Sequence, residues 1–218
     1  PATMHNTMMF FTDRGRCYWL RVYDIPEGTK QNKGRAIQNL LQIEPGDKVQ
    51  ACLLIRKLQD PDFCKSHYVV FATKDGIIKK TCLTEYSRPR TNGVNAIIIR
   101  EDDQLIQVEL TDGNSEIILA NRNGRAIRFH ESKVREMGRM STGVRAMTLD
   151  DDNDEVVGMI TMTGKEDETV MVVSENGYGK RSALDDYRIT NRGGKGVKTL
   201  AITEKTGNLV AIKNVTDA

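Results

Sequence analysis

Short apolar stretches alternate with polar, glycine-containing turns along the chain, and the same order of features occurs four times. Each unit has an apolar run, a tripeptide that ends in glycine, and a second run rich in apolar or β-branched residues. The four glycines of these tripeptides are Gly15, Gly76, Gly124 and Gly177. Glycine accepts the positive φ of tight hairpin turns, so each tripeptide predicts a β-hairpin. The predicted strand pairs are 8–11 with 17–20, 68–71 with 77–78, 117–119 with 126–129, and 170–173 with 178–181.

A second glycine follows each hairpin glycine by 17 to 19 residues, at Gly34, Gly93, Gly143 and Gly196. In the last three copies this glycine opens an alternating run that predicts a third strand, whereas the first copy lacks the alternation. A polar turn comes next, and a final apolar run predicts a fourth strand. These closing strands are predicted at 49–55, 105–110, 156–162 and 209–215.

Four strands in each unit of roughly 50 residues are typical of a propeller-like array. We therefore predict an all-β fold of four-stranded antiparallel blades, with about four repeats in one domain that spans 1–218. The expected repeats are 8–58, 67–115, 116–167 and 168–218. Patterning with a helical period is nearly absent, and 132–137 is expected to form at most one turn.

The composition is ordinary for a globular protein, with 39% hydrophobic and 28% charged residues. No apolar run approaches the roughly 20 residues of a membrane span, and the amino end lacks the pattern of a secretory signal. The four cysteines contain no Cys-x-x-Cys pair, so we expect reduced thiols and no zinc site. A cytoplasmic protein without a metal or cofactor of its own is the resulting expectation.

Charge changes this picture, because the basic residues recur at the same place in every repeat. The segments 14–35, 74–93, 122–145 and 175–198 hold 24 of the 32 Lys and Arg residues and 9 of the 30 Asp and Glu residues. They carry a net charge of +15, against −13 for the rest of the chain. In a radial array these segments predict a positive rim, which suits duplex DNA with one phosphate per ~1.7 Å of axis. Aromatic residues are sparse among them, which favours duplex binding over base stacking.

The predicted phosphate contacts are the Lys and Arg residues of these segments. They are Lys30, Lys33, Arg35, Lys79, Lys80, Arg88, Arg90, Arg125, Arg128, Lys133, Arg135, Arg139, Arg145, Lys180, Arg181, Arg188, Arg192, Lys195 and Lys198. Solvated loops without a partner are one alternative interpretation. Another is a propeller that binds proteins through its face rather than its rim.

Two stretches superficially resemble small-ligand or metal sites. The sequence "TNRGGKGVKTL" at 190–200 lacks the spacing of a phosphate-binding loop, and an alternating run follows it instead of a helix. The acidic stretch 150–155 lacks the glycine and the distal glutamate of a calcium loop. No nucleophile–base arrangement appears, so we expect no catalytic site in this chain.

Four stretches together resemble the carboxy-terminal domain of the DNA gyrase A subunit, part of a bacterial type II topoisomerase. They are "RGRCYWLRVYDIPEGTKQNKGRAIQNLL", "DGIIKKTCLTEYSRPRTNG", "GRAIRFHESKVREMGRMSTGVRAM" and "NGYGKRSALDDYRITNRGGKGVKTL". The resemblance implies a β-pinwheel, a propeller-like array whose neighbouring blades exchange strands. It also implies a non-catalytic module that wraps duplex DNA around its perimeter and supports negative supercoiling by the ATP-dependent enzyme.

The resemblance carries further expectations about the parent enzyme. ATP and Mg would be used by other segments, and the partners would be the remaining gyrase A segments and the gyrase B subunit of a heterotetramer. The location would be cytoplasmic, on the bacterial chromosome. The family is usually six-bladed, so a four-repeat chain is expected to be a fragment of the array. The equivalent domain of topoisomerase IV is the nearest alternative.

The family has a box motif, Gln-Arg-Arg-Gly-Gly-Lys-Gly, which normally lies in the first blade. The box-like loop of this chain consists of Arg192, Gly193, Gly194, Lys195 and Gly196, in the fourth repeat. We interpret it as the equivalent junction of a later blade.

Overall fold

The computed structural model describes residues 2–164 and 167–216, so residues 165–166 and 217–218 of the third and fourth predicted repeats lie outside the described part. The first eight strands are β1 (Thr7–Thr12), β2 (Arg16–Arg21), β3 (Val49–Ile55), β4 (Tyr68–Thr73), β5 (Ile77–Cys82), β6 (Val94–Asn95), β7 (Leu105–Thr111) and β8 (Glu116–Asn121). The others are β9 (Arg125–His130), β10 (Val144–Arg145), β11 (Val156–Met162), β12 (Thr169–Ser174), β13 (Gly179–Ala183), β14 (Val197–Lys198) and β15 (Leu209–Val215). One short helix, α1 (Pro61–Ser66), and several 3-10 turns complete the described fold, which confirms the all-β prediction.

The strands form four antiparallel sheets in which neighbouring repeats exchange a strand. The orders are β3-β1-β2-β6, β7-β4-β5-β10 and β11-β8-β9-β14, and the fourth sheet has the three described strands β15-β12-β13. Strand β6 follows the second hairpin in sequence but pairs with β2 of the first, with Cys17 opposite Val94. Strands β10 and β14 are donated backwards in the same way. This exchange agrees with the β-pinwheel that the family resemblance implies.

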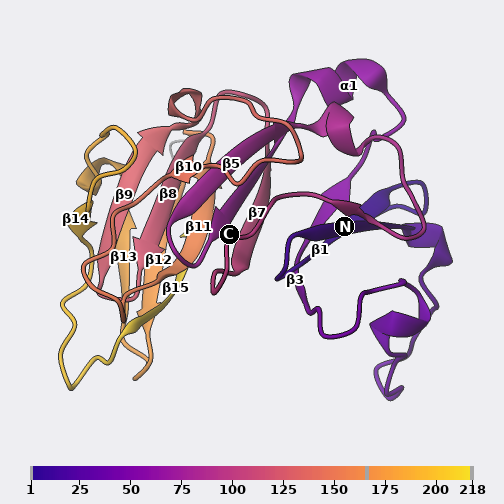
Figure 1. Cartoon of the computed structure of the whole chain (residues 1–218). Coiled ribbons are helices and arrows are strands. Elements are labelled where there is room, and N and C mark those ends of the chain that lie inside the picture. The colour runs from indigo at the N-terminus through magenta and orange to yellow at the C-terminus, as the bar shows by residue number, and fades with distance from the viewer. Residues whose placement is uncertain (1, 165–166, 217–218) are drawn as a thin grey trace.

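Three apolar clusters fill the spaces between consecutive sheets. Alternate residues of β4 face opposite ways, because Val69 and Phe71 belong to the first cluster and Val70 and Ala72 to the second. A strand buried on both faces explains why this stretch is continuously apolar. The closing strands β3, β7, β11 and β15 contact one another in chain order. Figure 1 shows the sheets in that order, from the indigo β1 to the orange and yellow strands of the last sheet.

The hairpin glycines form the turns, and the first three also contact the next repeat. Gly76 has φ 83°, and its carbonyl accepts hydrogen bonds from the amides of Ala146 (2.8 Å) and Met147 (3.3 Å). The carbonyls of Gly15 and Gly124 accept equivalent pairs of bonds from the following repeats. A side chain at these positions would collide with the neighbouring backbone, so glycine is needed for the close approach as well as for the positive φ.

The structure departs from the predicted elements in two places. The third strands of the last three repeats are only two residues long. After Gly34, where the alternation is missing, there is a 3-10 turn, Ile37–Asn39, as the first copy's lack of a strand pattern suggests. Helix α1 is not among the predicted elements, although the sequence contains its start signal. Asp60 caps it by accepting from the amides of Asp62 and Phe63, and Pro61 takes the first helical position, where its missing N–H is no loss.

Candidate nucleic-acid interface

The basic segments follow the outer edges of the sheets. In the last three repeats each segment leaves the second strand of a hairpin, passes through a 3-10 turn, and reaches the exchanged strand. These turns are η3 (Leu83–Tyr86), η4 (Glu131–Lys133) and η5 (Leu184–Asp186). The exchanged strands are the outer edges of their sheets, while the closing strands pack together at the opposite edges. The segments with the +15 charge therefore lie around the perimeter of the array.

Eleven of the predicted contact residues are exposed, and their side chains form neither an ion pair nor a hydrogen bond within the described part of the chain. They are Lys30, Lys33, Arg35, Arg88, Arg90, Lys133, Arg135, Arg145, Lys180, Arg188 and Lys198. All four repeats contribute to this set, which we call the rim cations. A periodic row of unpaired positive side chains provides counter-charges for a polyanion that follows the perimeter.

Three predicted contacts, Lys79, Lys80 and Arg128, are corrected by the structure because their side chains are buried. The Lys79 ammonium donates to the carbonyls of Ala96 (2.6 Å) and Arg139 (2.7 Å). Burial, together with the nearby positive charge of Arg139, lowers the pKa of Lys79 from 10.5 to about 7. An ammonium in this position holds segments of the array together and is not available to a phosphate.

Lys80 and Arg128 fasten their own repeats to the next in a related way. The Lys80 ammonium donates to the Glu131 carbonyl (3.2 Å) and lies 3.7 Å from the carboxylate of the same residue. The Arg128 guanidinium donates to the carbonyls of Leu184 and Tyr187, both at 3.0 Å. In the first repeat the equivalent residue is Trp19, whose indole N–H donates to the Tyr86 carbonyl at 3.0 Å. The acceptors lie in or beside the 3-10 turn of the following repeat, so this strand position serves as a fastening point.

Four other predicted contacts are partly engaged. Arg125 and Lys195 share the Asp150 carboxylate at 3.3 and 3.1 Å. Arg139 lies 3.8 Å from Glu85, and the Arg181 guanidinium donates to the hydroxyl of Thr169 at 2.6 Å. Exposed ion pairs contribute little stability, so a phosphate could replace these carboxylates, but the residues contribute less net charge than their number suggests.

The box-like loop is docked on the preceding repeat. The Gly193 amide donates to the Ala146 carbonyl at 2.6 Å, and the Gly194 carbonyl accepts from the Thr148 amide at 2.9 Å. At Gly196 an added Cβ would collide with the Ala126 carbonyl. The glycines of this loop therefore serve the contact between repeats. Arg192, the remaining predicted contact, donates to the carbonyls of Lys133 and Arg145, both at 3.0 Å.

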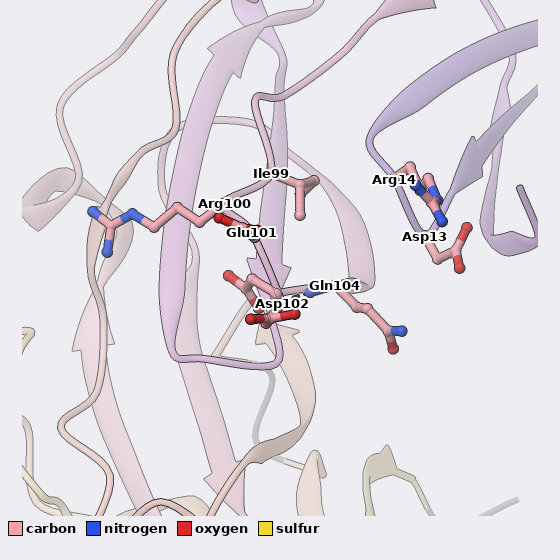
Figure 2. Close-up of a pocket in the computed structure, with 8 residues that line it drawn as sticks. Asp13, Arg14, Ile99, Arg100, Glu101, Asp102 and Gln104 are labelled. Carbon is pink, nitrogen blue, oxygen red and sulfur yellow. Dashed lines mark hydrogen bonds between the residues drawn. The ribbon is translucent and has the colours of Figure 1, made fainter.

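An acidic cavity lies at the hairpin-turn end of the first two repeats. Figure 2 shows its lining, which comes from the turn Asp13–Arg14 and the loop 99–104 and encloses about 600 Å³. Four carboxylates and two arginines line it, and Arg100 and Gln104 extend in opposite directions. Burial and the nearby Asp103 raise the pKa of Asp75 beside this loop. The net negative charge makes this end unsuited to phosphate and leaves the perimeter as the basic surface.

The described residues contain neither a metal-binding cluster nor a helix of membrane length. Within 2–164 and 167–216, no three His, Cys, Asp or Glu side chains are grouped so that they could hold a metal ion. The helices of this described part are too short to cross a bilayer. All four cysteines are free thiols, and burial raises the pKa of Cys17 well above its ordinary value.

Comparisons with known proteins agree with the repeat structure. The family model described as "DNA gyrase C-terminal domain, beta-propeller" matches residues 6–56, 67–112, 115–161 and 168–216. The DNA gyrase A subunit of Staphylococcus aureus (strain NCTC 8325 / PS 47) is 43% identical over 212 residues, which are 97% of this chain and 23% of that protein. The chain thus spans about a quarter of the length of this relative.

Two solved structures have the same fold. A crystal structure of the C-terminal domain of DNA topoisomerase IV matches with a TM-score of 0.82 and 26% identity, covering 99% of this chain and 64% of that one. A structure of the DNA gyrase A C-terminal domain matches with a TM-score of 0.80 and 23% identity, covering 99% and 67%. The matched segments include the hairpin and the closing strand of every repeat, and the chain belongs to the family of DNA gyrase C-terminal domains.

Proposed function

We propose that this chain is a non-catalytic module that binds duplex DNA and wraps it around the perimeter of the β-pinwheel, as part of a DNA gyrase A subunit. The observation that carries the proposal is the set of eleven rim cations, which come from the same segment of every repeat and lack carboxylate partners. The module would be one β-pinwheel fragment built from the repeats 8–58, 67–115, 116–167 and 168–218.

The energetics of such binding come mainly from counterion release. Each cation that neutralises a phosphate frees condensed counterions, and no base needs to be read. Bending a short DNA site costs about 1–6 kcal/mol in smooth elastic estimates, which many phosphate contacts together can offset. A curved row of exposed cations supplies these contacts, and the acidic turn end keeps the duplex on the perimeter.

The parent enzyme would perform the chemistry elsewhere. We propose that other gyrase A segments and the gyrase B subunit supply strand passage and ATP hydrolysis with Mg. Wrapping by this module would then set the direction of supercoiling. The complex would work in the bacterial cytoplasm, on the chromosome.

A salt titration of duplex binding tests the proposal. We expect affinity to fall by about 10³–10⁵ between 50 and 200 mM salt if six to ten phosphates are contacted. The double variant Lys133→Glu/Arg135→Glu should weaken binding and reduce the salt slope by about 2, since each lost phosphate contact reduces it by about 1. The matched control is Arg56→Glu/Lys57→Glu, which makes the same change of net charge outside the basic segments.

Two results would contradict the binding part of the proposal. Equal weakening by both double variants would mean that net charge alone attracts DNA, and an affinity independent of salt would favour the protein-binding alternative. Wrapping itself is measured as a change in linking number when relaxed circular DNA is nicked and closed in the presence of the protein. Tight binding without such a change would rule out the wrapping part.

A further inference from the structure

Two arginines make the same hydrogen bond at successive junctions between repeats. Arg139 and Arg192 each stand four residues before the second glycine of their repeat. The Arg139 guanidinium donates through Nη1 to the Asn95 carbonyl at 3.1 Å, and Arg192 donates through Nη1 to the Arg145 carbonyl at 3.0 Å. Both acceptors stand two residues after the second glycine of the preceding repeat. Donor and acceptor are therefore equivalent at the two junctions.

A backbone hydrogen bond beside each arginine repeats as well. The Ile98 amide donates to the Ser141 carbonyl at 3.0 Å, and the Thr148 amide donates to the Gly194 carbonyl at 2.9 Å. Each donor stands five residues after the second glycine of its repeat, and each acceptor two residues before that of the next. The basic loops of the third and fourth repeats are thus held on the preceding repeat at two points.

Around Arg192 this attachment connects three basic residues. Its Nε donates to the Lys133 carbonyl at 3.0 Å while its Nη1 binds the Arg145 carbonyl, so one guanidinium bridges two residues that are themselves exposed cations. None of the three has a carboxylate within ion-pair distance in the described part of the chain. The two carbonyl bonds hold Arg192 against the backbone of two residues whose own side chains are exposed cations. A phosphate is the group that such an arrangement would neutralise.

The second repeat has no arginine at this position and provides a contrast within the same chain. The position equivalent to Arg139 is Pro89, which has no side-chain donor. Its neighbours Arg88 and Arg90 are exposed, and their side chains make no hydrogen bond to the first repeat among the described residues. Charge alone does not fix a loop on its neighbour, because the equivalent loop of the second repeat is also basic.

We propose that Arg139 and Arg192 are positioning residues that hold successive basic loops at a fixed spacing, so that DNA spanning both repeats is wrapped and not only bound. This inference rests on the proposed function. It separates two roles within the basic segments. Residues such as Arg135 would contact phosphate directly, while Arg139 and Arg192 act mainly by placing the loops that carry them.

The variant Arg139→Lys/Arg192→Lys tests this, because lysine keeps the charge but has a single nitrogen. Arg192 uses Nε and Nη1 for two carbonyls, and Arg139 places Nη1 on the Asn95 carbonyl and Nε 3.8 Å from Glu85. We expect its affinity for a duplex of about one helical turn, roughly 10 base pairs, to stay within about twofold of the unmodified chain, because phosphate neutralisation needs only charge. On relaxed circular DNA the linking-number change for each bound protein should fall to less than half. Arg56→Lys is the matched control and should change neither measurement. Arg135→Ala should instead weaken binding to both DNAs.

Hydrogen exchange of the DNA-free protein supplies a readout that does not depend on DNA. In the double lysine variant the amides of Ile98 and Thr148 should exchange at least tenfold faster, while strand amides of β4 keep their protection. Unchanged exchange at both amides, or a loss of short-duplex affinity as large as the loss of wrapping, would overturn the inference. If the unmodified chain bound no DNA, the proposed function would fail and the DNA part of this inference with it, whereas the exchange rates would still decide whether the arginines hold the loops.

Discussion

The contact between repeats can be tested with two glycines that have the same backbone conformation and different surroundings. Gly76 has φ 83° and Gly177 has φ 79°, and both end hairpin turns. An added Cβ at Gly76 would lie 2.7 Å from the Met147 carbonyl oxygen, whereas at Gly177 no heavy atom would lie within 4 Å. Alanine at either position meets the same strain in the turn, but only Gly76→Ala also collides with the next repeat.

The two effects have different sizes. A left-handed backbone costs an L residue about 1–2 kcal/mol, which is the whole loss of unfolding free energy expected for Gly177→Ala. In Gly76→Ala the Met147 backbone must also move, which weakens the bonds from the Ala146 and Met147 amides to the Gly76 carbonyl. Each such bond contributes about 1 kcal/mol net. The expected loss for Gly76→Ala is therefore about 3–4 kcal/mol.

Urea denaturation followed by circular dichroism measures both losses under one set of conditions. Hydrogen exchange at the Ala146 amide provides a local readout, which should speed up in Gly76→Ala and stay unchanged in Gly177→Ala. Equal losses of stability in the two variants would refute the reasoning. They would mean that turn strain alone requires glycine and that the close approach between repeats contributes nothing.

Two further predictions concern buried cations. The pKa of Lys79 is lowered to about 7, so between pH 7 and 10.5 the unfolded chain holds a proton that the folded chain lacks. The unfolding free energy should therefore rise with pH across this window. In Lys79→Met this rise should be smaller, as measured by urea titrations at pH 7 and pH 10.5. The neutral amine still has two N–H groups for its two carbonyl acceptors. Arg128→Ala should lower the unfolding free energy by about 3–5 kcal/mol, because it leaves the largely buried Glu116 carboxylate, 3.4 Å from the guanidinium, and two carbonyls without their partner. Arg122→Ala removes only a half-exposed pair with Glu175 at 4.0 Å and should change it by less than about 1 kcal/mol in the same assay.

Much of the fold can be predicted from local sequence because its determinants are local. A glycine between two apolar runs specifies a hairpin wherever it occurs, and the predicted closing strand 156–162 coincides with β11. The pairing partner of the third strand is different. Val94 and Asn95 look the same whether they pair with their own hairpin or the preceding one, so only the family resemblance indicates the exchange. Asp60 and Pro61 form the start signal of α1, but a signal of two residues is too short to predict a helix.

The candidate site is predictable as a region and not residue by residue. The repeating charge locates the basic segments, but the sequence does not show which of their cations are buried, as Lys79 and Lys180 illustrate. Both stand three residues after their hairpin glycine, yet Lys79 is fully buried and Lys180 is exposed. The difference arises because the third repeat donates β10 onto β5, while no described strand pairs with the outer edge of β13. Burial of a cation here depends on the neighbouring repeat, which its own local sequence does not encode.

The cations that join repeats and the cations that bind DNA can be distinguished with two variants, each measured in a stability assay and in a DNA-binding assay. Lys80 is 7% exposed, while Lys133 is exposed and unpaired in the described residues. Lys80→Met removes the ammonium next to the buried Glu131 carboxylate, which keeps only its bonds from Thr111 and Ser115. It should lower stability and leave the salt slope of DNA binding unchanged.

Lys133→Met should do the reverse, reducing the slope by about 1 without changing the urea midpoint. Comparing the two variants in both assays separates a buried positive charge from an accessible one, although the sequence presents both as members of one basic repeat. If Lys80→Met reduced the slope as much as Lys133→Met, the Lys80 ammonium would have to reach DNA, and its assignment to the contact between repeats would be wrong.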